Sequence, residues 1–173
     1  MKYLTSITLI TSALLLGACT STSPSKAEIL EKTKEKEILG KVLFFDKNLS
    51  KNRTQSCATC HNPEAGFVDN RNNGIAAMAS LGDDGYSLGD RQAPSAAYAM
   101  FSPEFHYDKK KKQYKGGQFW DGRETNLAGQ AGGPPTNPIE MGMESKQTTV
   151  LRLKENVYYA STFKSIYGDD IFK

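Results

Sequence analysis

The stretch SCATCHNPEAGF, residues 56–67, holds two of the three cysteines and one of the two histidines in this 173-residue chain. On a helix, Cys57, Cys60 and His61 occupy positions i, i+3 and i+4, and so share one face within about one turn. Two thiols at this spacing reach the vinyl groups of a haem while the imidazole reaches its iron. The C-x-x-C-H pattern therefore indicates covalent attachment of a c-type haem, on a short helix that Ser56 is placed to cap.

Two other uses of this pattern fit the rest of the chain less well. A zinc site needs four ligands, which would be Cys57, Cys60, His61 and the remaining histidine, His106, with two of them adjacent in sequence. His106 lies in the aromatic stretch FSPEFHYD and is interpreted as a structural or surface residue. A thioredoxin-like dithiol would require a βαβ setting, which the sequence does not indicate.

The N-terminus has the pattern of an export signal. Lys2 precedes the apolar run TLITSALLL, residues 8–16, which is too short to be a transmembrane helix. The run ends in Leu-Gly-Ala-Cys, which resembles a bacterial lipobox, so residues 1–18 are predicted to be removed and Cys19 to carry a lipid. An ordinary secretory signal is the alternative. Both interpretations predict export, and we expect a periplasmic protein anchored through Cys19.

Charge and composition narrow the class of protein. Removing 18 residues from 173 leaves 155, and the formal net charge falls from +3 to +2 with the loss of Lys2. So small a charge does not indicate nucleic-acid binding. The run Lys109–Lys112 is interpreted as a solvated loop, or alternatively as a dock for an acidic partner. The chain is long enough for one domain, although 15 glycines and 7 prolines interrupt it, and a haem would add apolar core.

The periodicity of apolar residues predicts a mostly α fold with long loops. Residues 28–44 are predicted to form a helix, and residues 69–92 an extended loop. Shorter helices are expected over 93–100 and 124–131. A helix over 145–157 is predicted to start at Ser145, with Val150, Leu153 and Val157 on one face. No region of the sequence is rich in strand signals.

Four stretches in order, LGKVLFFDKNLS (39–50), SCATCHNPEAGFVD (56–69), FWDGR (119–123) and QAGGPPTNPIEMGM (130–143), resemble the bacterial di-haem cytochrome c peroxidase and MauG family. The resemblance extends from about Ile38 to Gly168. It implies two cytochrome-c-like domains with one haem each. Residues 19–35 would then be a tether and the start of the first helix, residues 36–143 the N-terminal haem domain, and residues 144–173 the helical start of a second, incomplete domain. Only one C-x-x-C-H is present, so we expect a C-terminally truncated chain.

The resemblance also assigns roles to individual residues. Cys57, Cys60 and His61 match the attachment motif of the peroxidatic haem. Trp120 matches a tryptophan that passes electrons between the two haems. Gln130, Pro134 and Glu140 match the distal pocket, where Glu140 would act as general base and then acid on peroxide. Gln130 would position peroxide or water, and Pro134 would fix the pocket wall.

Besides the missing second C-x-x-C-H, which is the largest departure, the chain departs from the family pattern at two places. Some members have a distal histidine where Asp83 or Asp84 stands here, so the iron is expected to need no reductive activation, as in MauG-like members. Gln92 stands where an asparagine commonly helps to bind calcium between the domains. Glutamine offers the same side-chain carbonyl oxygen one methylene further out, so Gln92 is considered as a calcium ligand.

These residues predict a peroxidase module that reduces hydrogen peroxide with electrons from a small periplasmic cytochrome c or cupredoxin. A MauG-like enzyme would instead use peroxide to oxidise a partner protein. The alternative is a mono-haem electron carrier with Met100 or Met78 as the sixth ligand; Met141 and Met143 are further possible ligands. A third hypothesis is a non-catalytic surface lipoprotein left by a decayed gene.

Overall fold

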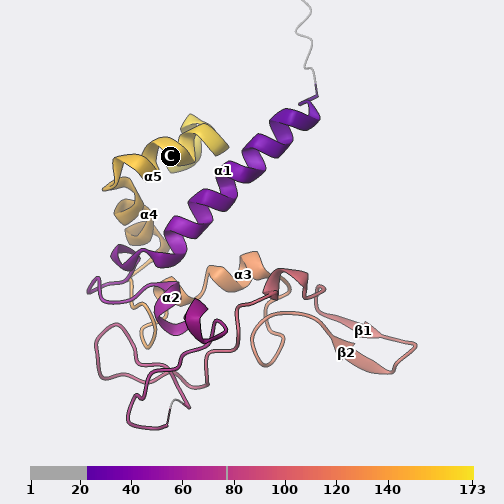
Figure 1. The fold of residues 1–173 in the computed structure, drawn as a ribbon, viewed down its shortest axis with the longest axis vertical. Helices are drawn as coiled ribbons and strands as arrows, with labels where there is room; N and C mark the ends of the chain where they lie inside the picture. Colours follow the sequence, from indigo (N-terminus) through magenta and orange to yellow (C-terminus); the bar gives the residue numbers. More distant parts are fainter. Residues whose placement is uncertain (1–22, 77) are drawn as a thin grey trace, which may run out of the picture.

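The computed structural model describes residues 23–76 and 78–173 (Figure 1). Cys19 and the predicted export signal lie outside these residues. Among the described residues, no helix combines the length and apolar character needed to cross a lipid bilayer. The α-helices are α1 (Lys26–Phe45), α2 (Cys57–Cys60), α3 (Leu127–Ala131), α4 (Lys146–Lys154) and α5 (Val157–Tyr167); the strands are β1 (His106–Asp108) and β2 (Gln113–Lys115). Single 3-10 turns lie at Lys47–Leu49, Pro63–Ala65, Ala99–Phe101, Pro134–Thr136 and Asp169–Phe172.

Helix α1 begins two residues before the predicted start, because Ser25 caps it. The Glu28 N–H donates to Ser25 Oγ at 3.3 Å, and the Ser25 N–H donates to Glu28 Oε2 at 2.7 Å. This reciprocal pair satisfies two of the free amides at the helix start. The helix ends at Phe45, where the Asp46 N–H turns back to the Leu43 carbonyl.

The hydrophobic core lies where α5 packs against the second half of α1 (Figure 1). Its buried members are Leu39, Tyr159 and Ile166, and the partly buried side chains around them are Leu43, Leu153 and Phe163. Tyr159 is buried to 2% exposure, and its hydroxyl donates to Asp46 Oδ2 at 2.7 Å. This packing crosses the domain boundary that the sequence predicts between residues 143 and 144.

We expect Leu39→Ala to lower the free energy of unfolding by about 2–5 kcal/mol, because it opens a cavity between α1 and α5. Urea denaturation followed by circular dichroism measures the change. Leu30→Ala on the same helix is the matched control, since Leu30 is 68% exposed and its loss should stay within about 0.5 kcal/mol. Equal effects of the two substitutions would contradict this account of the core.

The helix predicted over 145–157 is two helices. Its start is confirmed, because the Thr148 N–H donates to Ser145 Oγ at 3.1 Å and Thr148 Oγ1 accepts from the Ser145 N–H. It ends at Lys154, however, because the Asn156 side chain accepts the Tyr158 N–H at 3.0 Å and caps α5. The predicted shared apolar face is therefore wrong at Val157, which is 82% exposed in the first turn of α5.

The helix predicted over residues 93–100 is also wrong. The Ser95 hydroxyl donates to the Gly66 carbonyl at 2.6 Å, and the Ala96 N–H donates to the Phe67 carbonyl at 3.1 Å. These bonds tie the segment to a distant loop, so its amides are not available to a helix, and only the turn at Ala99–Phe101 follows. The helix predicted over 124–131 is shorter, because Asn126 caps it at Leu127. The described residues of the loop over 69–92, which are all but residue 77, form turns and no helix, as expected.

The hairpin of β1 and β2, which projects from the body of the molecule (Figure 1), was not predicted from the sequence. Tyr107 pairs with Tyr114 across the hairpin, and Phe105 stacks on the Tyr114 ring at 5.4 Å between centroids. The lysines of the run 109–112 are exposed at its tip. Each strand has three residues, too few for an alternating pattern to be recognised.

Candidate functional site

The two cysteines and the histidine of the motif are brought together by α2, as their spacing predicts. The Ser56 N–H donates to Thr59 Oγ1 at 2.9 Å at the start of α2, and the His61 N–H donates to the Cys57 carbonyl at 2.9 Å at its end. Cys57 and Cys60 are free, partly buried thiols. Burial raises the pKa of both, so they are protonated and uncharged at neutral pH.

The orientation of His61 is set by the loop that follows α2. Its Nδ1 lies 3.2 Å from the Phe67 carbonyl, which is also the acceptor of the Ala96 N–H. A neutral imidazole that donates from Nδ1 has its lone pair on Nε2, which leaves Nε2 able to bind a metal. Phe67 itself has a φ of 61°, a left-handed conformation that closes the loop from Asn62. The sequence could not indicate this carbonyl as a partner.

A partly buried ion pair lies next to Cys60 and was not predicted. Asp69 is 2% exposed, and Arg71 donates to it from Nη2 at 2.6 Å and from Nε at 2.9 Å. Arg71 Nη2 is also 3.5 Å from Cys60 Sγ. The pair places the Arg71 guanidinium against the Cys60 thiol, and the Asp69 carboxylate balances the charge of the guanidinium. The two residues are only two positions apart, but nothing in the sequence indicates that they reach Cys60.

Glu140 and Pro134 both lie in the segment that follows α3. The Pro134 carbonyl accepts the Met141 N–H at 3.3 Å, which folds the segment back beside Glu140. Glu140 is partly buried, and its Oε1 accepts from Asn137 Nδ2 at 2.9 Å. Burial raises the pKa of Glu140, although the Asn137 bond and the Arg123 guanidinium offset part of this rise; His61 is also among the groups close enough to act on this carboxyl. A glutamate of raised pKa near a histidine is the kind of group that exchanges protons during catalysis.

Gln130 and Trp120 differ in how far their side chains are exposed. Gln130 is partly buried in the last turn of α3, and its carbonyl accepts the Gly133 N–H at 3.1 Å just before Pro134. Trp120 is 63% exposed, and its Nε1 donates to the Gln92 carbonyl at 2.9 Å. Trp120 therefore lies on the surface of the described chain, next to the residue considered for calcium.

The neighbourhood of Trp120 carries paired charges. Asp121 accepts from Arg91 and Arg123, each at 3.0 Å. The Arg91 hydrogen bond, with those from Arg123, lowers the pKa of Asp121 to about 2. In the described residues, no group of three or more His, Cys, Asp or Glu side chains gathers closely enough to hold a metal ion.

The other candidate ligands are spread over the chain. Met78 and Met100 are 65% and 71% exposed, whereas Met141 and Met143 are buried to 5%. His106 lies on the surface at the start of β1, as expected, with its Nδ1 2.7 Å from the Glu104 carbonyl.

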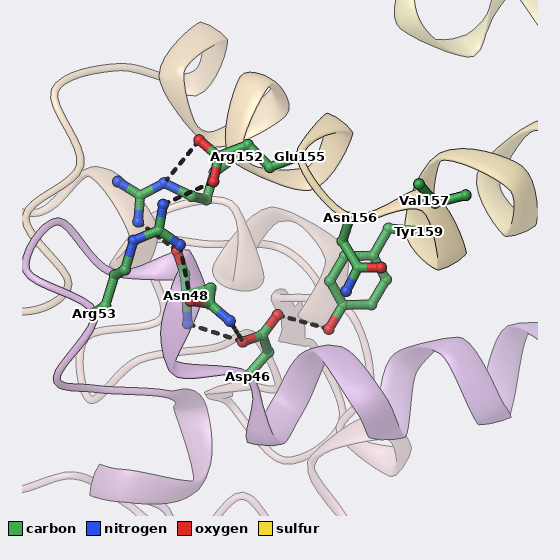
Figure 2. A pocket seen from close by; sticks show the side chains of 8 residues that line it. All are labelled: Asp46, Asn48, Arg53, Arg152, Glu155, Asn156, Val157 and Tyr159. Atoms are coloured by element: carbon green, nitrogen blue, oxygen red, sulfur yellow. Dashed lines mark hydrogen bonds and ion pairs between the residues drawn. The ribbon is translucent and has the colours of Figure 1, made fainter.

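An open cavity of about 360 Å³ lies between the end of α1 and the junction of α4 and α5 (Figure 2). Its lining is mostly polar and charged, and includes the ion pair of Arg53 and Glu155 at 2.7 Å and the bond between Tyr159 and Asp46. None of the predicted site residues lines it: the lining side chains are Asp46, Asn48, Arg53, Arg152, Glu155, Asn156, Val157 and Tyr159. This cavity is therefore separate from the site around α2.

Comparison with known proteins adds independent information. A family model described as di-haem cytochrome c peroxidase matches residues 34–173. The methylamine utilization protein MauG of Paracoccus denitrificans (strain Pd 1222) is 47% identical over 133 residues, which cover 77% of this chain and 34% of that protein. The cytochrome c peroxidase Ccp of Escherichia coli (strain K12) is 35% identical over 133 residues, covering 77% of this chain and 24% of that protein.

Solved structures agree with these relatives. The diheme peroxidase BthA from Burkholderia thailandensis E264 is similar with a TM-score of 0.70 and 31% identity, over 76% of this chain and 32% of that chain. A MauG-like protein associated with microbial copper homeostasis is similar with a TM-score of 0.57 and 28% identity, over 80% of this chain and 35% of that chain. The chain thus spans about a third or less of the length of these relatives.

Proposed function

Because this chain belongs to the di-haem cytochrome c peroxidase family, we propose that it is a c-type haem module of a peroxidase that reduces hydrogen peroxide. In this proposal, Cys57 and Cys60 hold the haem through thioether bonds and His61 binds its iron. The observation that carries the proposal is the hydrogen bond between His61 Nδ1 and the Phe67 carbonyl, which leaves Nε2 free on the same turn as two free thiols.

The residues around α2 fit a covalent haem. Both thiols are protonated and partly buried, which shields them in part from solvent. They form no disulfide with each other. His61 has one ring nitrogen engaged with a backbone carbonyl, which is the usual arrangement of a histidine that ligates a metal. The ion pair of Asp69 and Arg71 adds a balanced polar contact beside Cys60.

When bound, the haem supplies redox-active iron for a two-electron cleavage of the peroxide O–O bond. The proton transfers belong to the chain. The Glu140 carboxylate takes the proton from one peroxide oxygen and returns it to the other, which leaves as water. Asn137 orients that carboxylate through its amide. With two electrons from a donor and two protons from solvent, one peroxide gives two waters. Gln130 would hydrogen-bond to peroxide, and Pro134 would fix the wall beside Glu140.

The finer assignments belong to the same proposal. A small periplasmic cytochrome c or cupredoxin would donate the electrons, or, by analogy with MauG, a partner protein would be oxidised. Trp120 would relay electrons to a second haem, and Gln92, whose carbonyl accepts from Trp120, would contribute to a calcium site. The protein would lie in the periplasm, with Cys19 as its lipid anchor.

The test uses the chain expressed with a c-type haem maturation system and mixed with hydrogen peroxide in a stopped-flow spectrometer. We expect haem incorporation, a spectral change whose rate is first order in peroxide, and peroxide consumption when a reductant is present. A low-spin spectrum with a Met–iron charge-transfer band that does not respond to peroxide would contradict the proposal in favour of the carrier with Met100 or Met78. Failure to take up haem would favour the non-catalytic lipoprotein.

A further inference from the structure

Asp83 is a buried carboxylate that the peroxide chemistry does not use. Its side chain, in the loop after residue 80, is 4% exposed. It accepts hydrogen bonds from the Asn52 N–H at 2.6 Å, the Thr54 N–H at 3.2 Å and the Thr54 hydroxyl at 2.5 Å. Burial alone would raise the pKa of Asp83, but the bonds from Ser50, Thr54 and Asn52 outweigh burial and lower it. The carboxylate is therefore charged at neutral pH and has its donors in place.

The backbone of the same loop is tied to the segment that carries Glu140. The Asp83 N–H donates to the Glu140 carbonyl at 2.8 Å. The carbonyl of the next residue, Met141, accepts the Lys51 N–H at 2.9 Å. The loop also approaches this segment closely at Gly82, where an added Cβ would lie 3.0 Å from the Ile139 carbonyl. Residues 139–141 are thus held between two segments that the Asp83 carboxylate joins.

One of those segments leads directly into the attachment helix. Thr54 is followed by Gln55, which is buried to 4% and donates from Nε2 to the Leu81 carbonyl, and then by Ser56 and α2. Asp83 therefore links the segment that leads into α2, through its side chain, to the Glu140 backbone, through its N–H. No other described carboxylate spans these two segments.

We propose that Asp83 is a positioning residue that fixes Glu140 relative to Cys57, Cys60 and His61. This inference rests on the proposed function, in which Glu140 moves a proton at peroxide. Proton transfer needs a heavy-atom approach of hydrogen-bond length, and a displacement of about 1 Å costs about 10²-fold in rate. The Asp83 carboxylate itself faces Asn52 and Thr54, so it acts through Glu140 and does not touch substrate.

The neighbouring Asp84 provides a matched control. Its carboxylate accepts from the Tyr86 N–H at 3.0 Å and the Ser87 N–H at 2.8 Å, and so closes its own turn. Asp84→Asn removes the same charge one residue away from Asp83, without touching residues 50–55 or 139–141. Asp83→Asn keeps the size of the side chain, but it places an amide NH₂ against one of the N–H groups that donate to the carboxylate.

The experiment measures amide hydrogen exchange by mass spectrometry in the haem-loaded full chain. Asp83→Asn should speed exchange at least about tenfold in peptides covering residues 50–55 and 137–143, while Asp84→Asn leaves them unchanged. Exchange in α1 and α5 reports whether the core stays folded. If Asp83→Asn does not fold, Thr54→Val removes only the hydroxyl donor and should give a smaller increase in the same peptides.

The peroxide reaction provides the second measurement. We expect Asp83→Asn to slow it by about 10²-fold with no change in the haem attachment, whereas Asp84→Asn leaves the rate unchanged. Unchanged exchange over 137–143 in the Asp83 variants would overturn the positioning role. Faster exchange together with an unchanged peroxide rate would also overturn it, because Glu140 would then tolerate displacement. A peroxide rate insensitive to Glu140→Gln would instead remove Glu140 from the mechanism, and a haem-loaded chain that does not react with peroxide would show that the proposed function is wrong.

Discussion

Replacing Glu140 with glutamine should slow the reaction of the haem-loaded chain with hydrogen peroxide by about 10²- to 10⁴-fold, the range that a general acid–base group contributes. Glutamine keeps the size of the side chain and can still accept from Asn137, but it cannot take or return a proton. The measurement is the second-order rate constant in stopped-flow absorbance. The haem spectrum before mixing should be unchanged, which separates this effect from a loss of haem.

The pH dependence of the same rate supplies a sharper signature. Because burial raises the pKa of Glu140, its carboxylate becomes protonated at a higher pH than an exposed glutamate, whose pKa is about 4.3. A protonated carboxyl cannot act as the base. We therefore expect the rate to fall on acidification while the pH is still above that value, and the fall to be absent in Glu140→Gln.

The control for Glu140 is Glu144→Gln, four residues further on and exposed. It removes the same charge from the same stretch and should leave both the rate and its pH profile unchanged. A Glu140→Gln variant that reacts as fast as the unmodified chain would remove Glu140 from the mechanism.

Replacing both Cys57 and Cys60 with serine should abolish covalent haem attachment altogether. Each thiol is expected to form one thioether, so the double variant has none, while either single variant keeps one. Haem staining after denaturing electrophoresis detects the covalent bond directly, because haem that is only ligated is lost on denaturation. The size of the effect is all or none for the double variant.

Ala58→Ser is the matched control for the cysteines. It lies between them on α2 and changes neither thiol nor imidazole, so staining should persist. Stained protein from the double variant would contradict thioether attachment. Bound zinc in the unmodified chain, with no haem after maturation, would restore the zinc interpretation.

Local signals explain which parts of the fold were predictable. Ser145 marks a helix start because the bonds of a cap form within four residues, and the Cys57 helix follows from the same kind of signal at Ser56. The segment over 93–100 has helical composition but does not begin a helix, because the Ser95 hydroxyl and the Ala96 N–H bond to the Gly66 and Phe67 carbonyls. No local pattern contains that information. The hairpin was not predicted for another reason, because each of its strands has only three residues.

The candidate site, too, has residues that the sequence predicts and residues that only the structure reveals. The motif at Cys57, Cys60 and His61 is contiguous, so its chemistry could be predicted from spacing alone. Glu140, Gln130 and Trp120 were singled out only through the family resemblance. The Phe67 carbonyl, the pair of Asp69 and Arg71, and Asn137 depend on how the loops fold back, and only the structure brings them to the site.

The contact between α1 and α5 bears on the order of events during biogenesis. The Tyr159 hydroxyl reaches an aspartate 113 residues earlier in the chain. Closing so long a loop costs more conformational entropy than closing a short one, and contacts of this range make folding slow. The attachment motif lies inside that loop, and we expect it to stay accessible until the core around Leu39 and Ile166 closes. Maturation enzymes would thus meet Cys57 and Cys60 on an open chain, and thioether formation would precede tertiary closure.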